Sequence, residues 1–280
     1  MNNNDHLTRV ENSLQCVCRS KLKKFENFFL CESCNQKHMI RNQKVFFSQD
    51  YLNLEEWNHK EFKFDLFERI KKPNMPDIVG GPRLRDLVKK LKVNKIDNFI
   101  ALNLGGGQNK FEGVYNLDLG NYSNVNFVCS LYTLPFKDKS VDLLISNSVL
   151  EHVEQPDKVL DEASRVVKDN GYFYLCVPSV CLRHHKMDFT RWTMPGLKNL
   201  LQSRNFEILE HGACRGPGWV IWHMLESLVV SRTKKGFLRE FLRKLVMALT
   251  KPLVSMKVRN DEKEENMALT IFVIAKKKSN

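Results

Sequence analysis

The feature that most constrains the fold of this chain is an alternation of short apolar runs with loops and helical repeats, which begins at Phe99. The apolar runs have the length of buried strands, and the segment 155–168 between two of them carries apolar residues at helical spacing. This alternation is typical of a parallel sheet with crossover connections. The expected strands are residues 99–104, 114–117, 126–129, 141–146, 172–177, 206–209 and 268–275.

Helices are expected where apolar residues keep helical spacing, at residues 83–91, 155–168, 195–202 and 237–249. Asn170 and Gly171 supply a stop signal for the second of these helices. The interval between Gly107 and Val114 is too short for a helix, because a parallel crossover usually needs about a dozen residues or more. A shortened first crossover is therefore expected.

Gly105, Gly106 and Gly107 directly follow the first predicted strand, and their missing side chains let a ligand approach the backbone. Asp118 ends the second strand, where a carboxylate can accept hydrogen bonds from both ribose hydroxyls of a nucleoside. Alone, the turn fits many nucleotide sites and the aspartate fits an ordinary strand end. Together they favour a nucleoside cofactor, and the missing crossover helix argues against the pyrophosphate of NAD.

Four motifs follow one another in this region, namely LNLGGG at 102–107, NLD at 116–118, LPF at 134–136 and VLEH at 149–152. Over residues 80–276 the chain resembles class I SAM-dependent methyltransferases, in particular the type 11 group. The resemblance implies a Rossmann-like, mostly parallel seven-stranded sheet and S-adenosyl-L-methionine (SAM) as cofactor. The implied SAM-binding residues are Gly105, Gly106, Gly107, Asp118, Ser130, Leu131 and Asn147. Ser130 stands where the group commonly has an aspartate that faces the adenine amino group, and His152 has mainly a structural role.

The segment 183–197 also resembles this group, whose members carry a histidine, an aspartate and an arginine after the fifth strand. The acceptor is expected there. His185 and Asp188 are the candidate catalytic residues, since a histidine can take the proton of a hydroxyl or amine acceptor. In the alternative interpretation, Asp188 and Arg191 pair to hold the loop over the cofactor.

A compact group of cysteines marks the N-terminal module, predicted at residues 1–50. Two cysteine pairs at this separation suit a tetrahedral structural zinc, whose ligands would be Cys16, Cys18, Cys31 and Cys34. The segment resembles the zinc ribbon of Trm112-like proteins, but its first pair is one residue shorter than the usual C-x-x-C. A ribbon held by apolar packing alone is the alternative, and His38 is expected at the surface.

Residues 51–80 are interpreted as a connector, and residues 81–280 as the methyltransferase domain with a helical insertion at 216–259. Between residues 231 and 259, nine basic residues face one acid, so this segment carries much of the net charge of +12. In the helix expected at 237–249, one face is apolar and the other carries Arg239, Arg243 and Lys244. Such a helix suits an anionic membrane surface, or a lid with a solvated basic face.

The composition is that of an ordinary globular protein, and no apolar run reaches the length of about 20 residues that spans a bilayer. A cytoplasmic enzyme, with peripheral membrane contact, is expected. The predicted reaction is methyl transfer to a hydroxyl or amine of a glycan, lipid-linked or small-molecule acceptor. The alternatives are an RNA methyltransferase that uses the ribbon and the basic surface, and a non-catalytic scaffold that binds a partner.

Overall fold

The computed structural model describes residues 5–47, 81–91, 93, 98–107, 109, 111–258 and 262–279. The predicted connector at 51–80 lies outside the described residues. Two compact units are present, the first made of Met1–Asn147, Asp157–Phe173 and Lys277–Asn280, and the second of Ser148–Pro156 and Tyr174–Lys276. The predicted boundaries of the module, the connector and the methyltransferase domain stay predictions.

A mainly parallel sheet forms the centre of the first unit. Its strands are β5 (Ala101–Leu104), β6 (Val114–Asp118), β7 (Phe127–Val128), β8 (Val141–Asn147) and the first part of β9 (Val167–Pro178). They lie in the order β7-β6-β5-β8-β9, and β5 pairs in parallel with both β6 and β8. Parallel pairing brings the carboxyl ends of β5, β6 and β8 to one edge of the sheet, where open α/β sheets bind ligands.

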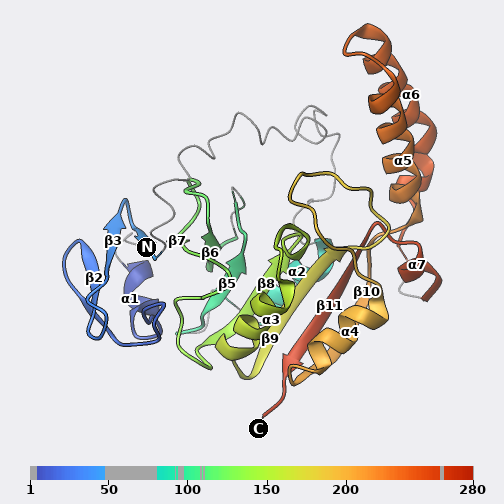
Figure 1. Ribbon diagram of the computed structural model, residues 1–280. Helices are drawn as coiled ribbons and strands as arrows, with labels where there is room; N and C mark the ends of the chain where they lie inside the picture. The colour runs from blue at the N-terminus through green and yellow to red at the C-terminus, as the bar shows by residue number, and fades with distance from the viewer. Residues whose placement is uncertain are drawn as a thin grey trace. The chain divides into compact units, whose positions relative to one another are not determined.

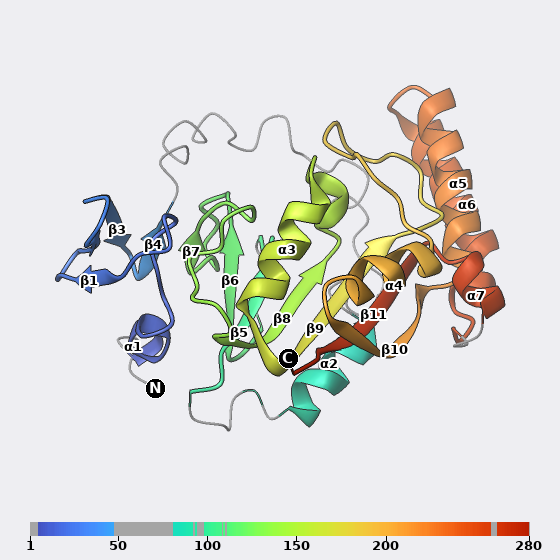
Figure 2. The ribbon, with the colours of Figure 1, turned by 60° about the horizontal axis from the view of Figure 1, so that its bottom comes forward.

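Helices α2 (Gly81–Lys90) and α3 (Pro156–Val166) also belong to the first unit. Figures 1 and 2 show α3 alongside β8. The expected stop at Asn170 and Gly171 is wrong, because α3 ends at Val166 and both residues lie inside β9. The described residues between Gly107 and Val114 form turns and no helix, which confirms the shortened first crossover.

The N-terminal module adds a short helix, α1 (Asp5–Glu11), and four small strands: β1 (Leu22–Lys24), β2 (Phe28–Cys31), β3 (Lys37–Arg41) and β4 (Lys44–Phe46). These strands pair antiparallel in sequence order. The last of them, β4, pairs in parallel with β7, with Val45 opposite Phe127. The module therefore extends the edge of the sheet, a connection that the sequence analysis did not foresee.

The second unit contains the end of β9 and a helical hairpin. Its elements are η2 (Leu150–His152), α4 (Met194–Gln202), β10 (Phe206–Arg215), α5 (Pro217–Arg232), α6 (Phe237–Val254), α7 (Glu262–Asn266) and β11 (Thr270–Lys277). The strand order is β9-β11-β10, so that strands β5 to β11 supply the seven strands expected. Helices α5 and α6 lie side by side (Figure 1). None of the helices in the described ranges is both long and apolar enough to cross a membrane.

Candidate functional site

The glycine turn after β5 has the backbone that a close ligand contact needs. Gly105 and Gly107 have positive φ angles of 58° and 52°, a conformation that favours glycine. A Cβ atom placed on Gly107 would meet no atom of the described residues within 4 Å, so the backbone is open toward them. A Cβ on Gly106 would lie 2.6 Å from Oδ1 of Asn116. Gly106 is therefore required by packing, and Gly107 is open to a ligand.

Asp118 ends β6 and is tied directly to this turn. Its Oδ2 accepts a hydrogen bond of 2.9 Å from the amide of Gly107, and its Oδ1 accepts one of 2.8 Å from the amide of Gly120. Burial raises the pKa of Asp118, while these amide bonds act in the opposite direction. The amide of Leu119 is a third donor to this carboxylate, which has about four lone-pair positions, so about one remains for a hydroxyl group of a ribose.

A buried pair of asparagines, Asn103 and Asn116, supports the loops that follow β5 and β6. The role of this pair was not predicted from the sequence. Nδ2 of Asn103 donates to Oδ1 of Asn116 across 2.9 Å, and the two residues lie opposite each other on β5 and β6. Nδ2 of Asn116 donates to the carbonyls of Asn109 and Asn124, at 2.5 and 3.0 Å. The sequence signal is an asparagine within each of two apolar strands, because a buried polar side chain needs partners.

The other predicted cofactor residues lie on the same unit. Ser130 follows β7 by two residues, and its Oγ accepts a hydrogen bond of 3.2 Å from the amide of Tyr132. Leu131 is buried, and Asn147 is the last residue of β8. The glycine turn, Asp118 and Asn147 are thus brought to the carboxyl ends of neighbouring parallel strands.

A second group of chemically active side chains belongs to the second unit. One ligand atom each of Glu151, His152 and His184 lies within 4.8 Å of the others. Nδ1 of His152 lies 2.6 Å from the carbonyl of Met187, so this nitrogen carries the proton and donates it. The other ring nitrogen, Nε2, lies 3.8 Å from Oε1 of Glu151. The ring of His152 makes edge contacts with both His184 and His185.

Glu151 is the unusual member of this group, because only 1% of it is exposed. No described residue offers a hydrogen bond to its Oε2. Burial raises the pKa of Glu151 to about 8, against the effects of its own amide and of Arg191. Burial also lowers the pKa of His152 and of His184. The three side chains therefore favour their uncharged forms.

Asp188 and Arg191 form an ion pair that holds the loop after β9. Two nitrogens of Arg191 donate to the Asp188 carboxylate, and the amide of His184 donates to it across 2.9 Å. Burial alone would raise the pKa of Asp188, but the bonds from Arg191 and His184 lower it to about 2. The pairing of Asp188 with Arg191, which the alternative interpretation expected, is confirmed, and its role toward a cofactor stays a prediction.

His185 lies in the same loop, and its Nδ1 accepts a hydrogen bond of 3.1 Å from the amide of Met187. The catalytic roles of His185 and Asp188 stay predictions. The carboxylate of Asp188 is already occupied by its partners, so its contacts suit positioning of the loop.

The predicted zinc ligands lie together in the N-terminal module. The Sγ atoms are separated by 3.6 Å for Cys16 and Cys34, 3.4 Å for Cys18 and Cys31, and 3.6 Å for Cys18 and Cys34. Four thiolates at about 2.3 Å from one zinc ion lie about 3.8 Å apart. The separations between the sulfur atoms are therefore close to those of a tetrahedral zinc site. The shortened first pair, Cys16 and Cys18, does not keep the four cysteines apart.

His38 is buried, so its expected place at the surface is wrong. It lies on β3, its Nε2 is 3.3 Å from Sγ of Cys16, and its ring packs against Phe47 at 4.6 Å. His38 thus contacts Cys16, one of the four cysteines. The position of His38 in the sequence did not indicate this contact.

The hairpin of α5 and α6 differs from the lid with a solvated basic face. Arg243 points toward α5, where its Nε donates to Oε1 of Glu226 across 2.5 Å, and Arg239 donates to the carbonyl of Val230. The expectation that Arg239 and Arg243 lie on a solvated face is therefore wrong. The exposed side of α6 is instead apolar, with Phe237 89%, Phe241 53% and Leu249 68% exposed.

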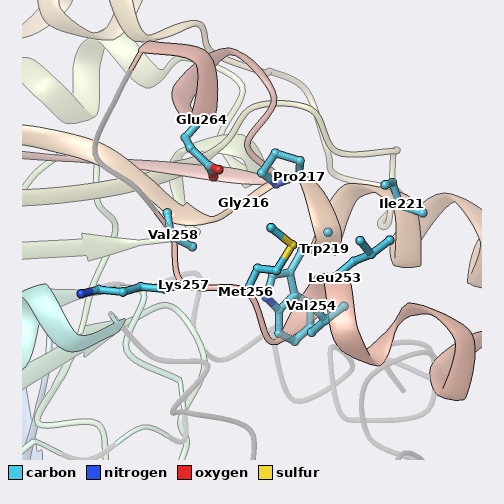
Figure 3. A pocket seen from close by; sticks show the side chains of 11 residues that line it. Gly216, Pro217, Trp219, Ile221, Leu253, Val254, Met256, Lys257, Val258 and Glu264 are labelled. Atoms are coloured by element: carbon cyan, nitrogen blue, oxygen red, sulfur yellow. The ribbon is translucent and has the colours of Figure 1, made fainter.

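A pocket lies where α5 begins and α6 ends. Its walls include the side chains of Trp219, Leu253 and Met256, with Glu264 at the opposite side (Figure 3). Close helix contact shapes it, because a Cβ on Gly218 would lie 2.2 Å from the carbonyl oxygen of Leu253. The pocket offers an apolar surface beside a carboxylate.

Comparisons with known proteins find a likeness to methyltransferase domains over part of the chain. Residues 109–175 match a family model described as a methyltransferase domain. A stretch of 38 residues is 50% identical to an uncharacterized protein of Methanocaldococcus jannaschii, and this covers 14% of the chain and 18% of that protein.

Among solved structures, a SAM-dependent methyltransferase from Archaeoglobus fulgidus is 16% identical, with 70% of this chain and 94% of that chain covered and a TM-score of 0.42. One chain of a complex containing the Trm112 methyltransferase activator of Haloferax volcanii is also 16% identical, with 69% and 89% covered and a TM-score of 0.41. The chain is thus similar to methyltransferase domains over residues 109–175, a range that contains Asp118 but not the glycine turn to which Asp118 is bonded.

Proposed function

We propose that the protein transfers the methyl group of SAM to a hydroxyl or amine of a glycan, lipid-linked or small-molecule acceptor. The observation that carries this proposal is the hydrogen bond between Gly107 and Asp118, which unites an open backbone turn with a strand-end carboxylate. A nucleoside needs this combination, because its ring approaches the backbone while the carboxylate accepts the ribose hydroxyls.

When bound, SAM supplies a methyl group on a positively charged sulfur. The backbone of residues 105–107 would border the nucleoside, and Asp118 would accept from the ribose. Ser130 and Leu131 would serve the adenine, and Asn147 would complete the binding edge at the end of β8. The open space over Gly107 supports the fit of this ligand.

On the acceptor side, His185 is the base: its Nδ1 would exchange the hydrogen bond from the amide of Met187 for the proton of the acceptor hydroxyl or amine. With SAM bound, the acceptor atom would gain the methyl group, and the electron pair of the broken C–S bond would stay on sulfur. Asp188 serves this step through Arg191, since their ion pair fixes the loop that carries His185. A base needs this kind of positioning to act within hydrogen-bonding reach.

The cysteine group of the N-terminal module holds a structural zinc ion. Cys16, Cys18, Cys31 and Cys34 would supply four thiolates, and the separations of 3.4 to 3.6 Å between their Sγ atoms support this. A module with such short strands gains much of its stability from the metal, because binding free energy becomes folding free energy.

The hairpin of α5 and α6 brings the enzyme to an anionic membrane surface, where a lipid-linked acceptor is found. The apolar stripe of α6 is exposed among the described residues, and Lys244 and Lys251 lie exposed near it. An exposed apolar helix face with neighbouring basic residues suits the boundary between headgroups and acyl chains.

The direct test uses SAM with a labelled methyl group and the purified protein. Total RNA, a lipid extract and glycan fractions serve as acceptors, and the variant Asp118→Asn serves as the control. Label in the lipid or glycan fraction supports the proposal. Label in RNA would favour the RNA methyltransferase instead, and a protein that binds no SAM would favour the scaffold.

A further inference from the structure

Glu151, His152 and His184 form a group with the composition of a metal site, separate from the cysteine group of the N-terminal module. The first two residues lie in η2, and the third lies in the loop after β9. Their ligand atoms lie within 4.8 Å of one another. Ligand atoms at about 2.1 Å from one ion lie about 3.0 to 3.5 Å apart, so small side-chain rotations close the group.

His152 is oriented as metal-binding histidines commonly are, and His184 lies beside a carboxylate. Nδ1 of His152 donates to the carbonyl of Met187 across 2.6 Å, so the lone pair is on Nε2, the nitrogen nearer Glu151. Nδ1 of His184 lies 3.1 Å from Oδ2 of Asp188. The same nitrogen lies 3.5 Å from a guanidinium nitrogen of Arg191, and the ring of His184 also hydrogen-bonds to the backbone of Leu182. Metal-binding histidines typically donate their second ring nitrogen to a carbonyl or carboxylate, which fixes the tautomer and the ring.

The carboxylate of Glu151 supplies an independent reason for a cation. Glu151 is almost completely buried, and its Oε2 has no hydrogen-bond partner within the described part of the chain. A buried carboxylate oxygen without a partner is costly, and buried charges are usually paired or bound to metals. Arg191 does not meet this need, because its guanidinium pairs with Asp188 and with the carbonyls of Cys181 and Leu182.

We propose that Glu151, His152 and His184 bind a divalent transition-metal ion. Two imidazoles and one carboxylate suit ions such as Mn²⁺, Fe²⁺ or Zn²⁺ better than Ca²⁺ or Mg²⁺, which prefer oxygen ligands alone. Three protein ligands leave further positions of the ion for an exchangeable group.

The role of this ion in acceptor chemistry rests on the proposed methyltransferase function. A divalent ion makes a neighbouring hydroxyl more acidic and so favours a hydroxyl acceptor over an amine. The hydroxyl proton passes to His185, the oxygen bonds to the methyl carbon, and the C–S electron pair stays on sulfur. Glu151 follows Asn147, the end of β8, by only four residues, which ties the group in sequence to the predicted cofactor edge.

The experiment is a Mn²⁺ titration of the full-length protein, with free Mn²⁺ followed by electron paramagnetic resonance. The wild type should bind one Mn²⁺ per chain, and Glu151→Gln and His152→Ala should each weaken binding by at least about tenfold. His211→Gln is the matched control, since His211 contacts Lys198 and Glu265 instead. Cys18→Ser should also leave Mn²⁺ binding unchanged, because thiolates favour Zn²⁺ over Mn²⁺.

Circular dichroism of each variant shows whether it folds. Because two ligands are substituted separately, the test remains possible if one of the two variants does not fold. A wild type that binds no Mn²⁺, or folded ligand variants that bind it as tightly as the wild type, would overturn the metal site. SAM affinity, measured by calorimetry without Mn²⁺, tests the proposed function separately. A wild-type protein that binds Mn²⁺ but not SAM would contradict the role of the ion in methyl transfer, while the metal site itself would still be supported.

Discussion

The amide of Gly107 lies 2.9 Å from Oδ2 of Asp118 and donates a hydrogen bond to it. One bond thus joins the turn after β5 to the end of β6. A missing crossover helix leaves this turn without the usual support of a helix N-terminus, and the carboxylate supplies some of that support. Asp118 therefore shapes the turn that we propose as the nucleoside site.

Replacement of Asp118 by asparagine should weaken SAM binding by about 1.5 to 3 kcal/mol, the scale for the loss of a charged hydrogen-bond partner. This corresponds to roughly tenfold to 150-fold in affinity, measured by calorimetry. Asp161→Asn is the control, because Asp161 is an exposed acid on α3. Equal affinities for Asp118→Asn and wild type would exclude Asp118 as a ligand of the ribose.

The N-terminal module should contain one zinc ion per chain in protein purified without added metal. Cys18→Ser should lose most of this zinc and lower the melting temperature of the module, because folding and metal binding are coupled. Cys181→Ser should keep the zinc, since Cys181 lies outside the cysteine group. Elemental analysis gives the ratio, and a wild-type value near zero would mean that the module folds without metal.

The strands and the glycine turn could be predicted because their signals are local. An apolar run of strand length followed by Gly105 marks the end of β5, and Asp118 marks the end of β6. The interval between Gly107 and Val114 is too short for a crossover helix, so the sequence excluded that helix. Each of these features depends on residues that are close neighbours in the sequence.

Features that depend on contacts between distant residues could not be predicted. The pairing of β4 with β7 joins Val45 to Phe127, and no local pattern indicates such a partner. Arg243 looks like a surface residue in the sequence, yet it meets Glu226 on the neighbouring helix. The ion pair of Asp188 and Arg191 was easier to predict than these contacts, because the two residues are only three positions apart. The pairing was one of the two interpretations of this loop.

The exposed stripe of α6 predicts binding to anionic vesicles. Each basic residue near such a surface contributes about 1 kcal/mol, and the apolar side chains add to this. A double variant, Phe237→Ser with Phe241→Ser, should lose co-sedimentation while it keeps its melting temperature, because both side chains are exposed. Leu209→Ser, an exposed leucine on β10, is the control. Wild-type protein that stays in the supernatant with anionic and neutral vesicles alike would contradict membrane binding.

Gly218 should be essential to the stability of the hairpin. Alanine there would place its Cβ 2.2 Å from the carbonyl oxygen of Leu253, and overpacking of this kind typically costs about 1 to 3 kcal/mol. Gly196→Ala in α4 is the matched control, because its nearest atom would be 3.3 Å away and alanine favours a helix. Thermal unfolding should show a lower midpoint for Gly218→Ala and an unchanged or higher one for Gly196→Ala. If both variants unfold at the same temperature, the two helices are not in close contact at Gly218.

His223 on α5 should make the protein less stable in mild acid. Burial lowers the pKa of His223, and the charges of Arg191 and Arg215 act in the same direction. Cys181 lies 3.9 Å from its Nε2, and the Trp222 ring lies beside it. Within the described ranges its Nδ1 has no partner.

The folded state thus binds the His223 proton less readily than the unfolded state, whose histidine pKa is about 6.5. Stability from this residue is complete above that pH and falls as the pH drops below it. The urea concentration at the midpoint of unfolding should fall between pH 7.5 and pH 5. This fall should be smaller for His223→Leu than for wild type. Met224→Leu, an exposed neighbour without a titratable group, should behave like wild type. Equal losses in the wild type and in His223→Leu would show that the acid sensitivity has another source.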